Sequence, residues 1–92
     1  MWIEGELKKD GRFWLVEIPG LNLFTQGRTK KEAYEMAKDL IEGLAEADGL
    51  KLDVTIIPEK ENRFRAGAKD TKIFTAFILR RWRLAHDLTL KE

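Results

Sequence analysis

Polar and apolar residues alternate along the first part of the chain with the period of two that a strand requires. The alternation is loose over residues 2–8, WIEGELK, and residues 12–18, RFWLVEI, are rich in aromatic and β-branched side chains. Asp10-Gly11 lies between these runs and is typical of a tight hairpin, because glycine adopts a positive φ without a Cβ clash. The pattern predicts a hairpin whose second strand ends at Pro19-Gly20, which breaks the ladder.

The second predicted strand has apolar side chains on both of its faces. Trp14, Val16 and Ile18 share one face, and Phe13 and Leu15 lie on the other. A strand with one face in water normally carries polar residues on that face. We therefore expect both faces of this strand to be at least partly covered.

A third strand and a helix follow directly. Residues 22–26, NLFTQ, form a short strand that ends at Gly27. Thr29 and Glu32 have the spacing of a capping box, in which the Thr hydroxyl accepts the amide of Glu32 and the Glu carboxylate accepts the amide of Thr29. The helix is expected to run to about Glu46. Its apolar stripe has helical spacing and consists of Ala33, Ala37, Leu40, Ile41 and Leu44.

Glycines mark the end and one interior position of this helix. Asp48-Gly49 closes the helix with glycine in the usual terminating place. Gly43 lies inside it, where glycine costs about 1 kcal/mol relative to alanine, so we expect close packing at this position. Residues 51–57, KLDVTII, then form a fourth strand.

The order of these elements predicts an α+β fold, with a two-layer β-β-β-α-β domain over residues 1–58 and one helix on one face of a small sheet. Residues 59–71 are expected to be a linker or to contain a short strand at 63–66. Residues 72–92 are expected to contain a basic helix, although residues 73–79 alone would also suit a strand. The helical stripe consists of Phe74, Phe77, Ile78, Trp82 and Ala85.

Composition indicates a folded chain and excludes several kinds of site. The 92 residues are 43% hydrophobic and 36% charged, which is enough apolar surface for a modest core. No apolar run approaches the roughly 20 residues of a membrane span, and the N-terminal residues lack the pattern of a signal peptide. Cys and Ser are both absent, so no disulfide or thiolate metal site is available and we expect a cytoplasmic protein.

The residue types offer little for catalysis. Without Ser or Cys the nucleophiles reduce to Thr and Tyr34, and His86 is the only histidine. A zinc site needs several His or Cys ligands. Asp39 and Glu42 share a helix side, but lysines alternate with them as on a solvated face. We therefore expect neither an enzyme nor a metal or cofactor site.

Charge is distributed unequally along the chain. Residues 1–62 carry 9 Lys or Arg against 13 Asp or Glu, whereas residues 63–92 carry 8 against 3. The basic part includes Arg80, Arg81 and Arg83 around a tryptophan. Such arginines can contact nucleic-acid phosphates, or they can lie in solvent around an inward-packed Trp82. The sequence leaves both interpretations open.

One stretch combines an aromatic strand, a Pro-Gly corner and a capped helix start. Its residues are Phe13, Trp14, Pro19, Gly20, Thr25, Gln26, Gly27, Thr29, Glu32 and Ala33. This run resembles the N-terminal domain of the HicB-like antitoxins, in which TQG-x-T-x-x-EA opens a helix. Arg28 departs from the family, which commonly has an acidic residue there. The resemblance covers about half of the chain and implies a trimmed RNase H-like sheet that also looks ferredoxin-like.

A weaker resemblance covers the C-terminal residues. Residues 79–92, LRRWRLAHDLTLKE, look like the first helix and the start of the second helix of a Cro/repressor-type helix-turn-helix. Thr89 and Glu92 repeat the capping-box spacing, so a second helix is expected to begin at Thr89. We expect the chain to be cut where that helix would continue, which leaves no recognition helix.

The resemblance implies a HicB-like antitoxin of a type II toxin–antitoxin system, which binds and neutralises a small HicA-type mRNA-cleaving toxin. The acidic first part of the chain suits such a basic partner. The candidate partner-binding residues are Glu17, Asn22, Phe24, Gln26 and Arg28. The candidate nucleic-acid-binding residues are Arg80, Arg81 and Arg83, and the structural motif consists of Pro19, Gly20, Gly27, Thr29 and Glu32.

Two other functions stay open. An orphan HicB-like transcriptional regulator would bind DNA through its basic C-terminal region in the full-length protein, and salt would weaken that binding steeply. A small enzyme would need metal-binding acids on strands, where only Glu17 and Asp53 are available. We also expect a homodimer or higher oligomer, because strand edges are exposed and part of segment 63–86 could pack against a partner chain.

Overall fold

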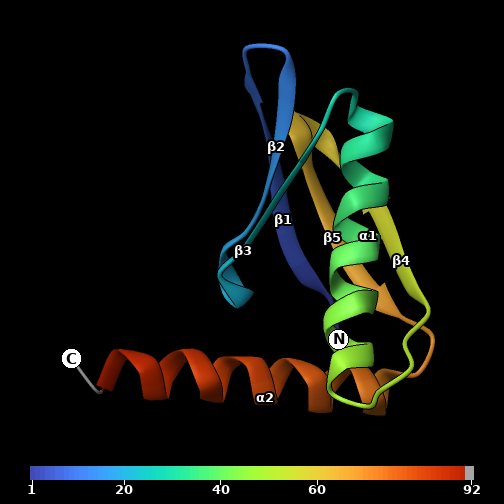
Figure 1. Cartoon of the computed structure of the whole chain (residues 1–92). Coiled ribbons are helices and arrows are strands. Elements are labelled where there is room, and N and C mark those ends of the chain that lie inside the picture. The colour runs from blue at the N-terminus through green and yellow to red at the C-terminus, as the bar shows by residue number, and fades with distance from the viewer. Residues whose placement is uncertain (91–92) are drawn as a thin grey trace.

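The computed structural model describes the backbone of residues 1–90 and the side chains of residues 1–84. It is an α+β fold in which five strands form one antiparallel sheet with the order β3-β2-β1-β5-β4 (Figure 1). The strands are β1 (Ile3–Asp10), β2 (Phe13–Ile18), β3 (Leu23–Gly27), β4 (Val54–Pro58) and β5 (Arg63–Ala68). The helices are α1 (Lys30–Ala47) and α2 (Thr71–Leu90), and two short 3-10 turns are η1 (Pro19–Leu21) and η2 (Lys60–Asn62).

The predicted hairpin and third strand are present. Gly11, in the tight turn between β1 and β2, has a φ of 59°, which glycine adopts without strain. The Pro19-Gly20 corner forms η1, and the amide of Asn22 donates to the Pro19 carbonyl at 3.1 Å. Asn22 has a left-handed φ of 54°, a conformation that asparagine tolerates better than most residues. This corner turns the chain from β2 into β3.

The N-terminus of α1 is capped as predicted, with one difference. Thr29 Oγ1 accepts the amide of Glu32 at 3.0 Å. The Glu32 carboxylate accepts the amide of Arg28 at 3.3 Å, whereas the capping-box spacing predicted the amide of Thr29. The carboxylate therefore reaches one residue further back along the turn.

The C-terminus of α1 has the glycine that the sequence predicts. The amide of Gly49 donates to the Glu46 carbonyl at 2.9 Å, and the amide of Leu50 donates to the Ala45 carbonyl at 2.8 Å. Gly49 has a φ of 76°. These two bonds and the left-handed glycine make a Schellman motif, which turns the chain toward β4.

The expected close packing at Gly43 is wrong. Gly43 is exposed, and no atom lies within 4 Å of the position that a Cβ would take. A glycine that does need the absence of a side chain is Gly27, where a Cβ would lie 2.4 Å from the backbone nitrogen of Ala33. The first turn of α1 therefore sits directly on the end of β3.

One face of the sheet packs against α1 and forms the core. Three alanines on the helix, Ala33, Ala37 and Ala45, are fully buried and let it approach the strands closely. The ring of Tyr34 meets the ring of Phe64 edge to face, with centroids 5.7 Å apart. The strands contribute Ile3, Leu7, Val16, Ile18, Leu23, Val54, Phe64 and Ala66 to this core.

The segment expected to be a linker or a short strand contains β5. This strand lies between β1 and β4, and its Phe64 and Ala66 are fully buried. The sheet therefore continues past residue 58, and the boundary predicted there does not divide it. The charged run that suggested a linker is the turn between β4 and β5, where Glu61 and Asn62 both have a φ of 60°.

The ambiguous residues 73–79 are helical and belong to α2. Phe74, Phe77 and Ile78 are fully buried against η1 and β5, so α2 closes one end of the two layers. Trp82, which belongs to the predicted apolar stripe, is 45% exposed and lies beside η1, with its Nε1 4.0 Å from the position of a Cβ on Gly20. Beyond this contact α2 projects past the body of the molecule (Figure 1).

The helix start expected at Thr89 is wrong. α2 continues through Thr89 to Leu90, so the backbone of residues 71–90 contains no turn between a first and a second helix. Glu92, the other half of the predicted capping box, lies outside the described residues. The described part of the chain thus ends in one helix.

Candidate partner-binding face

Neither helix covers the second face of the sheet. On this face of β2, Phe13 is 38% exposed but Leu15 and Glu17 are half-buried, so the expectation that both faces of β2 are at least partly covered is confirmed. Phe24, on the neighbouring strand β3, is 63% exposed. The reason is that α2 packs at the end of the sheet rather than across it (Figure 1). We call this surface the open face. It consists of Trp2, Glu4, Glu6, Lys8, Asp10, Phe13, Leu15, Glu17, Phe24, Gln26, Thr55, Ile57, Arg63 and Arg65.

The strand register aligns four side chains across the open face. Phe24 lies opposite Glu17, Glu17 lies opposite Glu6, and Glu6 lies opposite Arg63. We call this line the Phe24–Arg63 row. Like charges directly opposite each other destabilise a sheet. Glu17 is paired with Lys8, which lies outside the row, with Lys8 Nζ 3.2 Å from Glu17 Oε2. Glu6 lies opposite Arg63 but forms no ion pair among the described residues, so its carboxylate is available to a cation of a partner.

Apolar side chains border the two carboxylates. Leu15 pairs with Gln26, one step along from the Glu17–Phe24 pair, so Leu15 and Phe24 are diagonal neighbours on the open face. Phe13 precedes Leu15 by two residues and lies on the same face. Exposed aromatic and aliphatic groups beside acidic groups suit a protein partner, because a nucleic-acid backbone would be repelled by the carboxylates.

The opposite corner of the open face is closed by Trp2. Its ring lies over Gly67, where a Cβ would come within 2.7 Å of the ring. The Arg65 guanidinium lies 5.2 Å from the centre of the same ring, and Arg65 Nε lies 3.0 Å from Glu59 Oε2. These groups already contact one another, so the apolar group without such contacts on the open face is Phe24 of β3, which is 63% exposed.

Three of the five predicted partner-binding residues meet on the open face. Glu17, Phe24 and Gln26 lie on the adjacent strands β2 and β3. Asn22 and Arg28 lie at the two ends of β3, so β3 separates them.

Sequence reasoning missed Glu6 and Arg63. Glu6 has a visible signal, since it alternates with apolar residues in WIEGELK. Arg63 joins the row only because β5 pairs with β1, a contact between residues far apart in the sequence. The local pattern around Arg63 does not contain this information.

The predicted nucleic-acid-binding arginines do not form one exposed cluster. Arg80 Nε lies 3.5 Å from Asp48 Oδ2 at the end of α1. Arg81 is half-buried, and only Arg83 is both exposed and outside an ion pair among the described residues. The charge available for phosphate contacts on this part of α2 is therefore smaller than the sequence suggested.

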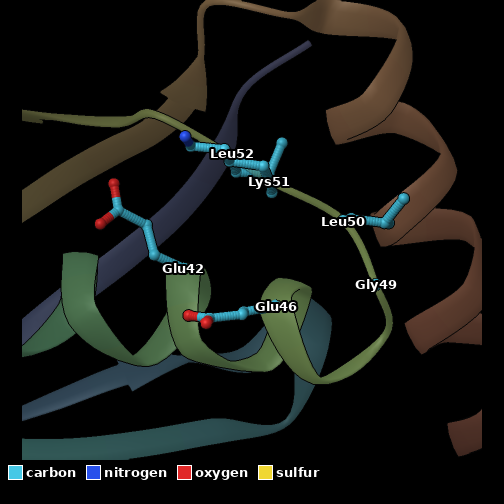
Figure 2. A pocket seen from close by; sticks show the side chains of 6 residues that line it. All are labelled: Glu42, Glu46, Gly49, Leu50, Lys51 and Leu52. Atoms are coloured by element: carbon cyan, nitrogen blue, oxygen red, sulfur yellow. The ribbon is translucent and has the colours of Figure 1, made fainter.

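A separate hollow of about 550 Å³ lies beside the C-terminal half of α1. Figure 2 shows it between Glu42 and Glu46 of the helix and the segment from Gly49 to Leu52. Glu42 Oε2 accepts the amide of Val54 at 2.8 Å, so this carboxylate has a structural partner. In the described part of the chain no group of three or more His, Cys, Asp or Glu could hold a metal ion.

The two acids that could support an enzyme do not converge. Glu17 lies on β2 and contacts Lys8, whereas Asp53 precedes β4, at the other side of the sheet, with its Oδ2 4.0 Å from Lys69 Nζ. Acid–base or two-metal chemistry needs carboxylates that face one substrate. This pair therefore does not form a catalytic site.

Among residues 1–90 no helix combines the length and apolar character that crossing a membrane requires. Comparison with known proteins found no matching family model, no matching curated protein and no matching solved structure.

Proposed function

We propose that the chain is a HicB-like antitoxin that binds a small, basic, mRNA-cleaving toxin of the HicA type through the open face. The observation that carries the proposal is the Phe24–Arg63 row, where an exposed ring lies next to two opposed carboxylates. A partner arginine or lysine placed between Glu6 and Glu17 would relieve their repulsion and form charge-assisted hydrogen bonds. Phe24 would supply the apolar contact beside them.

Binding at this face would also explain how the toxin is inhibited. An RNA-cleaving protein attracts its substrate with positive charge. A carboxylate-bearing face that covers this charge competes with the RNA phosphates and repels them. The −4 balance of residues 1–62 has the sign that such competition requires.

The test begins with capture of the tagged chain from an extract of its own cells and identification of co-purifying proteins by mass spectrometry. A small basic protein is expected, and its RNA cleavage is then measured with added chain. Phe24→Ala should weaken the complex at least about tenfold, as loss of a central aromatic contact does in other interfaces. Met36→Ala is the matched control, because Met36 is 39% exposed on α1, against the other face.

The proposal is contradicted if the captured basic protein cleaves RNA equally fast with and without excess chain. It is also contradicted if Phe24→Ala and Met36→Ala inhibit as well as the wild type. In either case the open face is not where a toxin is neutralised.

A DNA-binding regulator is the second candidate, favoured by the projection of α2 past the body with Arg83 exposed on it. It requires the full-length protein to bind its own upstream DNA, with an affinity that falls steeply between about 50 and 200 mM salt. Arg83→Glu should abolish that binding while leaving toxin inhibition intact. No gel shift at low salt would exclude this candidate.

A further inference from the structure

One edge of the sheet is protected against pairing with another strand. The Lys69 amide donates to the Asp53 carbonyl, and the Glu59 amide donates to the Arg63 carbonyl. The backbone groups of Asp53 and Glu59 therefore point toward β5. Those of the alternate residues on β4, namely Val54, Ile56 and Pro58, point away from the sheet. The Val54 amide is already bonded to Glu42 Oε2, and proline has no amide hydrogen. On β4 only Ile56 offers a free donor at this edge.

The other edge, β3, has no such protection. Its sequence LFTQG contains no charge and no proline, and Phe24 is 63% exposed. Natural edge strands usually carry lysine, proline or a bulge that prevents pairing with a second strand. A five-residue uncharged edge is therefore available for pairing.

The outward backbone groups of β3 can be assigned from the register. Gly11 and Arg12 make a two-residue hairpin loop, so the flanking pair Asp10 and Phe13 is hydrogen-bonded. Alternation along β2 then directs the backbone groups of Val16 and its alternate neighbours toward β3. On β3 the groups that point away from the sheet are consequently those of Phe24 and Gln26.

We propose that two copies of this chain pair through β3, antiparallel and around a two-fold axis at Thr25. In this register Phe24 of each copy lies opposite Gln26 of the other, and each of these residues exchanges backbone hydrogen bonds with its counterpart. The two sheets join into one continuous sheet. The interface is isologous, as in most homodimers.

The side chains are compatible with self-pairing. No charged residue meets its own copy in the paired strands, because β3 has none. Asn22, at one end of β3, lies opposite Arg28 of the other copy, where an amide oxygen can accept a hydrogen bond from a guanidinium. The open faces of the two copies become one continuous surface, so the dimer goes beyond the proposed function and does not compete with it.

The expectation that part of segment 63–86 packs against a partner chain stays a prediction, and it rests on Leu79 and Trp82, which are 44% and 45% exposed. Phe64, Phe74, Phe77 and Ile78 of that segment are fully buried in the core of their own chain. β3 is the edge that lacks a partner. A pair of five-residue strands buries less than the roughly 800 Å² per partner of a standard interface, so we expect a reversible dimer with a Kd on the order of micromolar.

The test is the mass of the 92-residue chain in solution by sedimentation equilibrium, over concentrations from about 1 µM to 1 mM. The mass should rise from 10.7 kDa to twice that value. Gln26→Pro removes an outward amide and should stay monomeric where the wild type is mostly dimeric. Gln26→Ala is the matched control, because it removes the same side chain but keeps the amide, and it should dimerise.

Amide hydrogen exchange locates the contact independently of any variant. The amides of Phe24 and Gln26 should exchange at least about tenfold more slowly at the highest protein concentration than at the lowest. The outward amide of Ile56 on β4 should not change. If Gln26→Pro fails to fold, these exchange rates still test whether the dimer forms through β3.

A monomer at every concentration overturns the proposal, as does a dimer in which the Phe24 and Gln26 amides exchange at unchanged rates. A dimer that survives Gln26→Pro in folded form overturns it too. Failure of the proposed function is separate, because the wild-type chain can be assayed for toxin inhibition at concentrations at which it is monomeric.

Discussion

At the scale of single residues, two glycines of the same region have opposite roles. Gly27 lies where a Cβ would contact the backbone of Ala33, and Gly43 lies in open space on the solvent side of α1. The sequence places Gly27 at the end of a strand and Gly43 inside a helix, but it does not show which of them is packed. The packing of α1 on the end of β3 decides this, so substitutions at the two glycines should differ in sign.

Gly27→Ala should lower the free energy of unfolding by about 3 kcal/mol, within the upper range of single substitutions. The added methyl group meets the backbone nitrogen of Ala33 at 2.4 Å, and backbone cannot move aside as a flexible side chain can. Urea denaturation followed by circular dichroism measures the change. A loss below about 1 kcal/mol would mean that α1 does not start on β3 as described.

Gly43→Ala should raise the free energy of unfolding by about 0.5–1 kcal/mol, because alanine has the higher helix propensity and restricts the unfolded chain. The same urea titration reports it, at a protein concentration low enough to keep the chain monomeric. Destabilisation by this variant would show that something packs against Gly43 after all.

Tyr34 should make stability depend on pH in the alkaline range. Burial raises the pKa of the Tyr34 phenol above its ordinary value of 10.0. The unfolded chain therefore ionises first, so the contribution of this group is level below pH 10 and is lost as pH rises through the raised folded-state pKa.

The difference in the free energy of unfolding between wild type and Tyr34→Phe, measured as a function of pH, separates this effect from the titration of lysines in the same pH range. Since Tyr34 is the only tyrosine, phenolate absorbance reports its titration directly. A midpoint at or below pH 10 in the folded protein would contradict the burial of this ring.

At the scale of elements, the sequence predicted the ends of α1, because interactions between residues close in the sequence determine them. The cap at Thr29 and the glycine at Gly49 set the ends of α1, and both act within a few residues. The sequence did not show β5 as a full strand, because RFRAGA is short, one-third basic and rich in small residues. Its strand conformation depends on β1 and β4 on either side, which only the tertiary fold supplies.

One carboxylate on α1 connects that helix to the edge strand β4. Glu42→Ala should cost about 1–2 kcal/mol of stability, because the partly buried Val54 amide loses its acceptor. Glu46→Ala is the matched control one turn further on, since Glu46 is exposed and should change stability by less than about 0.5 kcal/mol. Thermal unfolding of both variants measures the two changes in stability. Equal losses from Glu42→Ala and Glu46→Ala would contradict a structural role for the Glu42–Val54 hydrogen bond.

At the scale of the whole molecule, the candidate site depends on register between strands. The sequence predicted Glu17, Phe24 and Gln26, which lie on neighbouring strands joined by one short turn. It did not predict the full row, because Glu6 and Arg63 enter through pairings of β1 with β2 and with β5. Nor could it show that α2 leaves the second face uncovered, since both α2 and β2 carry enough apolar residues to be packed in several ways.

Binding through the open face is tested by titrating the chain into an RNA-cleavage assay with the small basic protein it captures. We expect cleavage to stop near one equivalent of wild-type chain. Phe24→Ala should need at least about ten times more chain for the same inhibition, whereas Met36→Ala should behave as wild type. Undiminished cleavage at a large excess of wild-type chain, or equal inhibition by Phe24→Ala, would contradict binding through the open face.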